Sequence, residues 1–229
     1  MKDGFIRVAA ATPDIHVADP QYNSEQIIEL MEQGSARGVK VMAFPELCLT
    51  AYTCSDLFLQ ESLLREAKKE LKRILQASKS KDMILFVGMP WMHKGKLYNV
   101  AAVLNRGRIL GIVPKKHLPN YSEFYELRHF NPGMEKVEMT DWEGVQVPMG
   151  MNLLFACRTM PELVLAAELC EDVWVPCPPS ISHALAGATV IANCSASDET
   201  TGKDQYRYNL ICGQSARLVC GYIYANAGE

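Results

Sequence analysis

Three apolar segments follow one another in the middle of the chain with no helical segment between them. MILFVGMP (83–90), LYNVAAVLN (97–105) and RILGIVPK (108–115) each read as a strand, and a turn at Gly107 joins the last two. Consecutive strands of this kind form a meander, whereas a doubly wound sheet alternates strands with helices. The order therefore favours two sheets packed face to face with helices outside over a single doubly wound sheet.

Strands and helices alternate before this meander. FIRVAAAT (5–12) and VKVMAF (39–44) read as strands, and SEQIIELMEQGSARG (24–38) between them reads as a helix capped by Asn23 or Ser24.

The segment ESLLREAKKELKRILQASKS (61–80) has the spacing of an amphipathic helix. Charged residues occupy one face and predict contact with solvent. The apolar face predicts contact with a core and consists of Leu64, Ala67, Leu71, Ile74 and Leu75.

The second half of the chain returns to a mixed order. NLLFACRT (152–159), LVLAAELC (163–170), TVIANCSA (189–196) and YIYANAG (222–228) read as strands. ISHALAGA (181–188) and QYRYNLICGQSARLVCG (205–221) read as helices. The chain stops directly after a strand, at ANAGE, so we expect a longer natural chain that has been cut here.

Composition narrows the class of protein. The 229 residues carry a net charge of -3, whereas a nucleic-acid-binding surface needs a basic excess. No apolar run approaches the ~20 residues of a membrane span, and the first residues lack a signal peptide's apolar stretch. We therefore expect a cytoplasmic protein. The eight cysteines include no CxxC pair and are expected to be reduced, and the histidines form no zinc-binding pattern.

Three predicted strands end in chemically reactive residues. VKVMAF runs into Glu46, RILGIV into Lys115, and LVLAAEL into Cys170. If these ends converge, Lys115 would favour the Cys170 thiolate against the neighbouring acids Glu171 and Asp172, and Glu46 would act as general base. Taken singly, Cys170 reads as a buried inert thiol, Glu46 as a loop or cap residue, and Lys115 as a surface charge.

Four longer stretches carry a family resemblance. AFPELCLTAYTCSDLF (43–58), VPKKHLPNYSEFYELRHF (113–130), AAELCEDVWVPCPPS (166–180) and IANCSASDETTGKDQYR (191–207) resemble the nitrilase, or carbon-nitrogen hydrolase, superfamily. Within it they look most like the glutaminase domains of glutamine-dependent NAD synthetases. The resemblance implies an α/β fold of the four-layer αββα sandwich type, with residues 1–229 as the glutaminase domain, truncated at the C-terminus, and the synthetase domain absent.

The resemblance also implies roles for individual residues. The lysine directly after the motif's proline is the catalytic one, which selects Lys115 over Lys116. Glu46 is expected to be partly buried near Cys170, and Glu126 to orient Lys115 and keep it charged. The catalytic set is Glu46, Lys115, Cys170 and Glu126, and the substrate-binding set is Tyr121, Glu171, Trp174, Ser197 and, more weakly, Tyr52.

The implied reaction is hydrolysis of glutamine through a cysteine thioester, with the oxyanion held by Lys115 and the backbone N–H of Glu171. This step needs no cofactor, and ATP and Mg belong to the absent synthetase domain, which would receive the ammonia to convert deamido-NAD to NAD. A homo-oligomer is expected. Two alternatives stay open, namely an amidase for another small amide and a catalytically silent interaction module. Ala51 stands where the family often has glycine, so a positive φ there would strain the loop that carries Tyr52.

Overall fold

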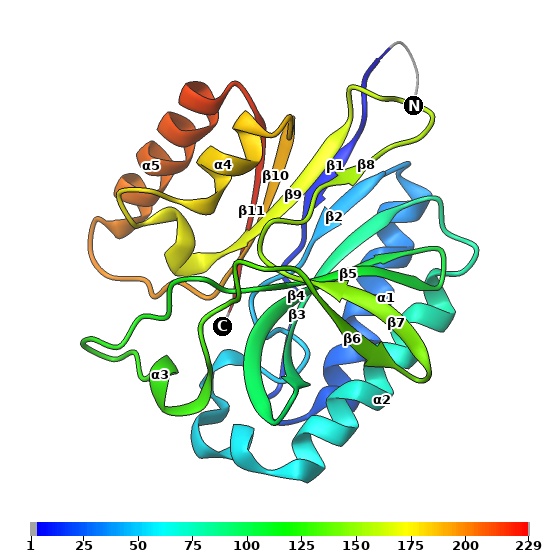
Figure 1. The fold of residues 1–229 in the computed structure, drawn as a ribbon, viewed down its shortest axis with the longest axis vertical. Coiled ribbons are helices and arrows are strands. Elements are labelled where there is room, and N and C mark those ends of the chain that lie inside the picture. Colours follow the sequence, from blue (N-terminus) through cyan, green and yellow to red (C-terminus); the bar gives the residue numbers. More distant parts are fainter. Residues whose placement is uncertain (1–3, 229) are drawn as a thin grey trace.

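Two β-sheets pack face to face in the computed structural model, which describes residues 4–228 (Figure 1). The larger sheet has the order β1-β2-β3-β4-β5-β7-β6. Its strands are β1 (Val8–Ala10), β2 (Val41–Ala43), β3 (Ile84–His93), β4 (Lys96–Asn105), β5 (Arg108–Pro114), β6 (Glu138–Trp142) and β7 (Val145–Met149). β3, β4 and β5 pair antiparallel, as the predicted meander requires, while β1, β2 and β3 are parallel.

The smaller sheet has the order β11-β10-β9-β8. It consists of β8 (Phe155–Ala156), β9 (Val164–Leu169), β10 (Val190–Ser195) and β11 (Gly221–Asn226). β9, β10 and β11 are parallel, so their carboxyl ends meet at one edge of the sheet. Residues that follow β9 and β10 are thereby placed beside one another.

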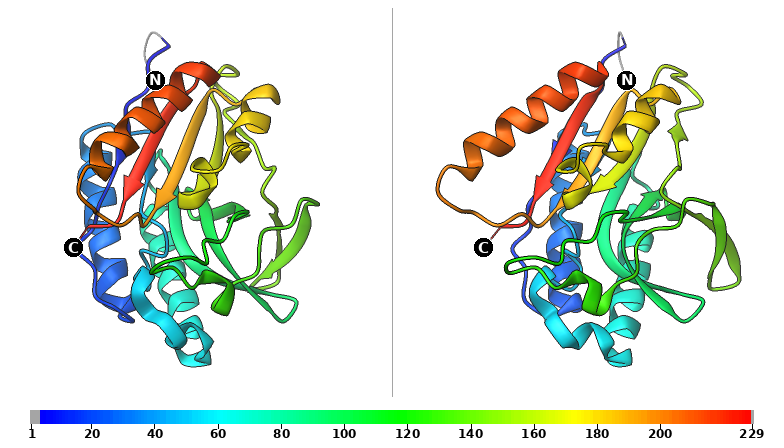
Figure 2. Two further views of the ribbon diagram at one scale, coloured as in Figure 1. Left: turned by 90° about the vertical axis from the view of Figure 1, so that its left-hand side faces the viewer. Right: turned by 60° about the vertical axis from the view of Figure 1, so that its left-hand side comes forward.

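Helices cover the outer faces of both sheets (Figure 2). α1 (Pro20–Ala36) and α2 (Glu61–Ser78) lie on the larger sheet, and α4 (Pro179–Leu185) and α5 (Lys203–Leu218) lie on the smaller one. Short helical turns, η1 (Tyr52–Leu59), α3 (Glu126–His129) and η2 (Cys170–Val173), lie in the loops. The predicted αββα sandwich is confirmed. Within residues 4–228, no helix combines the length and the apolar character that a membrane crossing needs.

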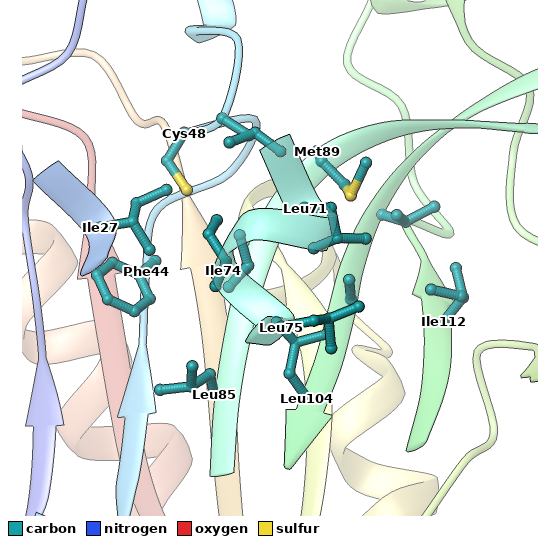
Figure 3. Packing of buried hydrophobic residues seen from close by; sticks show 14 of the residues in the cluster. Ile27, Phe44, Cys48, Leu71, Ile74, Leu75, Leu85, Met89, Leu104 and Ile112 are labelled. Atoms are coloured by element: carbon teal, nitrogen blue, oxygen red, sulfur yellow. The ribbon is translucent and has the colours of Figure 1, made fainter. Parts of the chain in front are cut away.

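The amphipathic face of α2 packs onto the larger sheet through four of its five predicted residues, whereas Leu64 is only partly buried and packs against another cluster. Leu71, Ile74 and Leu75 of α2 are buried with Leu85 and Leu104 of β3 and β4 (Figure 3). Burying each such side chain contributes roughly 1.5–3 kcal/mol. A second apolar cluster fills the space between the two sheets, where Phe86 and Val113 of the larger sheet meet Leu165, Ala192 and Ile223 of the smaller one.

Two local predictions were wrong, and one hairpin was missed. α1 begins at Pro20 with Asp19 as its N-cap, because proline suits the first turn and the Asp19 side chain accepts from Tyr22 N–H. Asn23 instead donates from its side chain to the Leu49 carbonyl. The β6–β7 hairpin was not predicted, and the strand predicted over 152–159 is reduced to the two residues of β8.

Candidate active site

Glu46 follows β2 and is completely buried. Its Oε1 accepts from Lys115 Nζ at 2.6 Å and from Asn99 Nδ2 at 2.6 Å, and its Oε2 accepts from the backbone N–H of Ala196 at 3.1 Å. β4 of the larger sheet and the residue directly after β10 of the smaller sheet therefore each supply a donor to this carboxylate. Glu46 was expected to be partly buried, and the structure buries it completely.

Lys115 follows β5 and is also completely buried. Its Nζ contacts Glu46 Oε1 at 2.6 Å and Glu126 Oε1 at 2.5 Å. Burial opposes the ammonium charge, but the two carboxylates outweigh it and raise the pKa of Lys115 above the ordinary lysine value. The lysine is therefore held as a cation between two carboxylates.

Two polar side chains complete this cluster. Asn99 of β4 donates to Glu46 and, at 3.4 Å, to Glu126 Oε2. The Tyr52 hydroxyl donates to Glu126 Oε1 at 2.8 Å. Tyr52 thus lies against the carboxylate cluster. Sequence reasoning missed Asn99, although a single amide inside the apolar run LYNVAAVLN is a signal that could have revealed it.

Cys170 comes directly after β9, where the chain turns sharply into η2. Its φ is +40°, a left-handed conformation that costs a non-glycine residue about 1 kcal/mol. The residue is 5% exposed. Burial is the main cause that raises the pKa of the Cys170 thiol, and Glu46 adds to it, while Lys115 and the Ala196 N–H act in the opposite direction.

Lys115 acts on the Cys170 pKa in the predicted direction, but its effect is not the dominant one. Lys115 was predicted to favour the Cys170 thiolate, but burial and the Glu46 carboxylate outweigh it, so the pKa lies above the ordinary thiol value. The structure does bring the three predicted residues together, since Glu46 and Lys115 both act on the pKa of Cys170. Attack by sulfur therefore requires transfer of the thiol proton.

The two acids that follow Cys170 in the sequence face other partners. Glu171 accepts from the Tyr121 hydroxyl at 3.1 and 3.0 Å, and burial raises the pKa of the Glu171 carboxyl. Asp172 is buried and accepts from the backbone N–H groups of His117 at 2.8 Å and Leu169 at 3.0 Å. Asp172 thus links the turn that carries Cys170 to the segment that follows Lys115, a contact that the sequence did not reveal.

Trp174 lies against α5. Its ring stacks on Tyr206 with centroids 5.5 Å apart, and Lys203 Nζ lies 5.3 Å from the Trp174 ring centroid. Lys203 also pairs with Asp198 and acts on the pKa of Glu171. Lys203 therefore adds a cation close to the Tyr121–Glu171 pair. Sequence analysis included this lysine only within the family-like stretch 191–207 and gave it no role.

Ser197 follows β10 and is 8% exposed. Its backbone N–H donates to Asn226 Oδ1 at 2.8 Å, and its carbonyl accepts from Asn226 Nδ2 at 3.1 Å. The backbone of Ser197 is therefore fixed at the same edge of the sheet as Cys170, because β9 and β10 are parallel neighbours.

Ala51 has φ +71° and ψ 151°, so the positive φ anticipated from the sequence is present. This combination is almost restricted to glycine and costs of order 1–3 kcal/mol in an alanine. The strained residue directly precedes Tyr52, whose hydroxyl reaches Glu126.

A buried cysteine with a lysine and two carboxylates around it agrees with the comparison with protein families. The carbon-nitrogen hydrolase family matches residues 7–227, nearly the whole chain. The chain belongs to the carbon-nitrogen hydrolase family. Residues 7–227 therefore form a hydrolase domain of the nitrilase superfamily, as the four sequence stretches indicated.

Curated relatives in this family are larger proteins. The chain is 42% identical over 226 residues to the glutamine-dependent NAD(+) synthetase of Mycobacterium tuberculosis, with 99% of the chain and 33% of that protein covered. It is 31% identical over 222 residues to the enzyme of the same name from Aquifex aeolicus, covering 97% of the chain and 35% of that protein. The chain spans about a third of the length of these relatives.

Two solved structures share the fold of this chain. The glutamine-dependent NAD(+) synthetase of Cytophaga hutchinsonii superposes with a TM-score of 0.87 at 29% identity, covering 97% of this chain and 36% of that one. An amidase from Nesterenkonia sp. superposes with a TM-score of 0.74 at 19% identity, covering 97% of this chain and 76% of that one. The second likeness concerns the carbon-nitrogen hydrolase fold alone.

Proposed function

We propose that this carbon-nitrogen hydrolase domain hydrolyses the side-chain amide of glutamine to glutamate and ammonia. The observation that carries the proposal is the buried cluster of Glu46, Lys115 and Glu126 that acts on Cys170. The relatives' printed name, glutamine-dependent NAD(+) synthetase, supports glutamine as the amide.

In the first half-reaction the Cys170 thiol gives its proton to Glu46 as sulfur attacks the amide carbon. A carbon–sulfur bond forms, and the carbonyl oxygen becomes an oxyanion. Lys115 Nζ and the backbone N–H of Glu171 are the proposed donors to that oxygen. Glu171 lies in the first turn of η2, where backbone N–H groups have no intrahelical acceptor and are available to a ligand.

Collapse of this intermediate breaks the carbon–nitrogen bond. Glu46 returns its proton to the leaving nitrogen, so ammonia departs and a γ-glutamyl thioester remains on Cys170. In the second half-reaction Glu46 accepts a proton from water, hydroxide adds to the thioester carbon, and the carbon–sulfur bond breaks. The proton held by Glu46 returns to the sulfur, and glutamate leaves.

Substrate recognition uses the groups around η2. Glutamine carries an ammonium group and a carboxylate, and each needs a partner of opposite charge or a hydrogen-bonding group. Glu171, which is held by the Tyr121 hydroxyl, is the proposed partner of the ammonium group. Lys203, which lies over the Trp174 ring, is the proposed cation for the carboxylate. Ser197 and Trp174 are further proposed substrate contacts.

The released ammonia would be consumed by a synthetase domain that converts deamido-NAD to NAD with ATP and Mg. This part of the proposal rests on the relatives, of which the chain spans about a third. The carbon-nitrogen hydrolase domain supplies the ammonia in this scheme and has no part in the adenylation chemistry.

The test is ammonia release from glutamine, with asparagine and propionamide as competing amides. Labelling with 6-diazo-5-oxo-norleucine, followed by peptide mapping, should place one adduct on Cys170 that excess glutamine suppresses. Cys170→Ser should abolish both signals, whereas Cys212→Ser, which changes an exposed thiol, should leave them unchanged. Hydrolysis of propionamide but not glutamine would replace this proposal with an amidase for small amides. A folded protein that hydrolyses neither amide and takes no label would point to an interaction module.

A further inference from the structure

The backbone of the nucleophile is held by a side chain from the neighbouring strand. The N–H of Cys170 donates to Asn193 Oδ1 at 3.1 Å, and Asn193 is completely buried in β10. The Ser195 hydroxyl donates to the same oxygen at 2.7 Å. Because Cys170 has a left-handed φ, this contact helps to hold the strained turn that carries the sulfur.

A buried chain of hydrogen bonds fixes which way the Asn193 amide points. Asn193 Nδ2 donates to the Tyr222 hydroxyl oxygen at 3.1 Å, and that hydroxyl donates to Glu168 Oε1. The other oxygen of Glu168 accepts from the backbone N–H of Ser180 at 2.8 Å. We name Glu168, Tyr222 and Asn193 the orienting chain.

The direction of each bond in the orienting chain follows from the chemistry of Glu168. A carboxylate only accepts, so the Tyr222 proton is committed to Glu168 and the hydroxyl oxygen is left to accept from Asn193. Asn193 must then present its NH2 group to Tyr222. Its oxygen is thereby directed to the Cys170 N–H.

The same end of β10 holds the carboxylate cluster. The Ser195 carbonyl accepts from the backbone N–H of Glu46 at 3.2 Å, and the N–H of Ala196 donates to Glu46 Oε2 at 3.1 Å. Residues 193–196 therefore contact the nucleophile and its proposed base at once. A rotation of the Asn193 amide would disturb the relative position of sulfur and carboxylate.

We infer that Glu168, through Tyr222 and Asn193, is a positioning residue that sets the direction of the Cys170 thiol. The inference concerns the reactivity of the thiol and deepens the proposed function, on which its kinetic part rests. None of these three side chains was singled out in the sequence.

The sharpest test is Glu168→Gln, which keeps the shape and changes one acceptor into a donor. In this variant the side-chain oxygen of Gln at position 168 accepts from the Ser180 N–H, so its NH2 group donates to the Tyr222 hydroxyl oxygen. The Tyr222 hydroxyl must then donate its proton to Asn193. Asn193 must then turn its oxygen to Tyr222 and its NH2 group to the Cys170 N–H, which places two donors face to face. We expect alkylation of Cys170 by iodoacetamide to slow about tenfold.

The double variant Glu168→Gln/Tyr222→Phe separates this mechanism from a loss of packing. Without the hydroxyl nothing forces the Asn193 amide to turn, so the double variant should recover part of the lost alkylation rate. Simple damage to the core would make the two losses add. An additive or larger loss in the double variant would overturn the inference.

Two exposed thiols serve as internal references for the alkylation rate in every sample. Cys177 and Cys212 are exposed thiols, and their alkylation rates, read from the same peptide map, should not change. Glu70→Gln is the matched variant, because Glu70 is a buried carboxylate that accepts from Ser24 on the α1–α2 side. It should leave the Cys170 rate unchanged. If Glu168→Gln does not fold, Asn193→Ala removes the acceptor directly and should show the same tenfold loss.

The two proposals can fail separately. If Cys170 is alkylated selectively but glutamine is not hydrolysed, the proposed function is wrong, and the variant rates still decide the inference. If glutamine is hydrolysed, Glu168→Gln should lower kcat about tenfold and leave KM within about twofold, since the orienting chain does not contact the substrate. An unchanged alkylation rate in folded Glu168→Gln contradicts the inference.

Discussion

Gly88 of β3 lies directly against the backbone of Glu46. A Cβ built on Gly88 would stand 2.7 Å from the Glu46 Cα and only 2.2 Å from the Pro45 carbonyl oxygen. Backbone atoms cannot move aside as flexible side-chain ends can. The absence of a side chain at position 88 therefore allows the segment that carries Glu46 to reach Lys115.

Gly88→Ala should displace Glu46 and cost activity out of proportion to stability. A shift near 1 Å lowers catalysis by about 100-fold, whereas overpacking of this size costs about 1–3 kcal/mol. Ammonia release and urea denaturation measure the two effects. Gly213→Ala is the matched variant, because its Cβ meets nothing within 4 Å in the interior of α5. It should preserve activity and stabilise by about 0.5–1 kcal/mol. Equal activity in both variants contradicts the assigned role of Gly88.

Ala51→Gly should stabilise the protein. Glycine adopts φ +71° and ψ 151° without strain, whereas alanine pays about 1–3 kcal/mol for this conformation. Glycine also lowers the free energy of unfolding by about 0.5–1 kcal/mol, because it gives the unfolded chain more conformational freedom. We expect a net gain near 1 kcal/mol in the free energy of unfolding by urea. Ala77→Gly in the last turns of α2 should instead destabilise by about 1 kcal/mol. A loss of stability at both positions would mean that Ala51 is not strained.

Lys115→Met should abolish activity and destabilise the domain by about 3–5 kcal/mol, because it leaves Glu46 and Glu126 buried without their cation. Thermal denaturation and ammonia release measure the two effects. Lys116→Met is the control, since the described contacts of Lys116 with Asp172 come from its backbone N–H. This neighbour should change stability by less than about 0.5 kcal/mol.

His183 should make the protein less stable as pH falls below about 6.5. Burial lowers the pKa of His183 below 6.5; its Nε2 lies 2.8 Å from the Met151 carbonyl, and its Nδ1 has no partner among residues 4–228. Below pH 6.5 His183 therefore becomes protonated more readily in the unfolded chain than in the folded protein. The contribution of neutral His183 to the free energy of unfolding is fully present above pH 6.5. As pH falls from 6.5 toward the folded-state pKa, this contribution declines by at most about 1.4 kcal/mol per pH unit.

His183→Gln tests this dependence, because glutamine can still donate to Met151 but does not titrate. Urea unfolding at pH 7.5 and pH 5.5 should show a smaller difference in the variant than in the natural sequence. Identical differences would mean that His183 titrates equally in both states.

Patterns of apolar residues predicted the elements that bury a whole face. The helix over 61–80 was predicted almost to its observed ends, because its charged and apolar residues separate at helical spacing. The start of α1 was predicted too late in the sequence, because the N-cap is Asp19, whose side chain accepts from the Tyr22 N–H, and not Asn23 or Ser24. The β6–β7 hairpin is paired to the sheet edge, and its partly exposed strands carry a weaker pattern.

Local sequence therefore decided the types and order of the main elements, and it marked Glu46, Lys115 and Cys170 as reactive residues at strand ends. Only the tertiary structure decided the environment of that site. Asn99, Asp172 and Asn193 act through partners 23 to 56 positions away in the chain, and such contacts leave no periodic signal. The pKa of Cys170 likewise depends on burial and on Glu46 more than on the acids beside it, because electrostatic effects depend on distance and solvent exclusion in the folded protein.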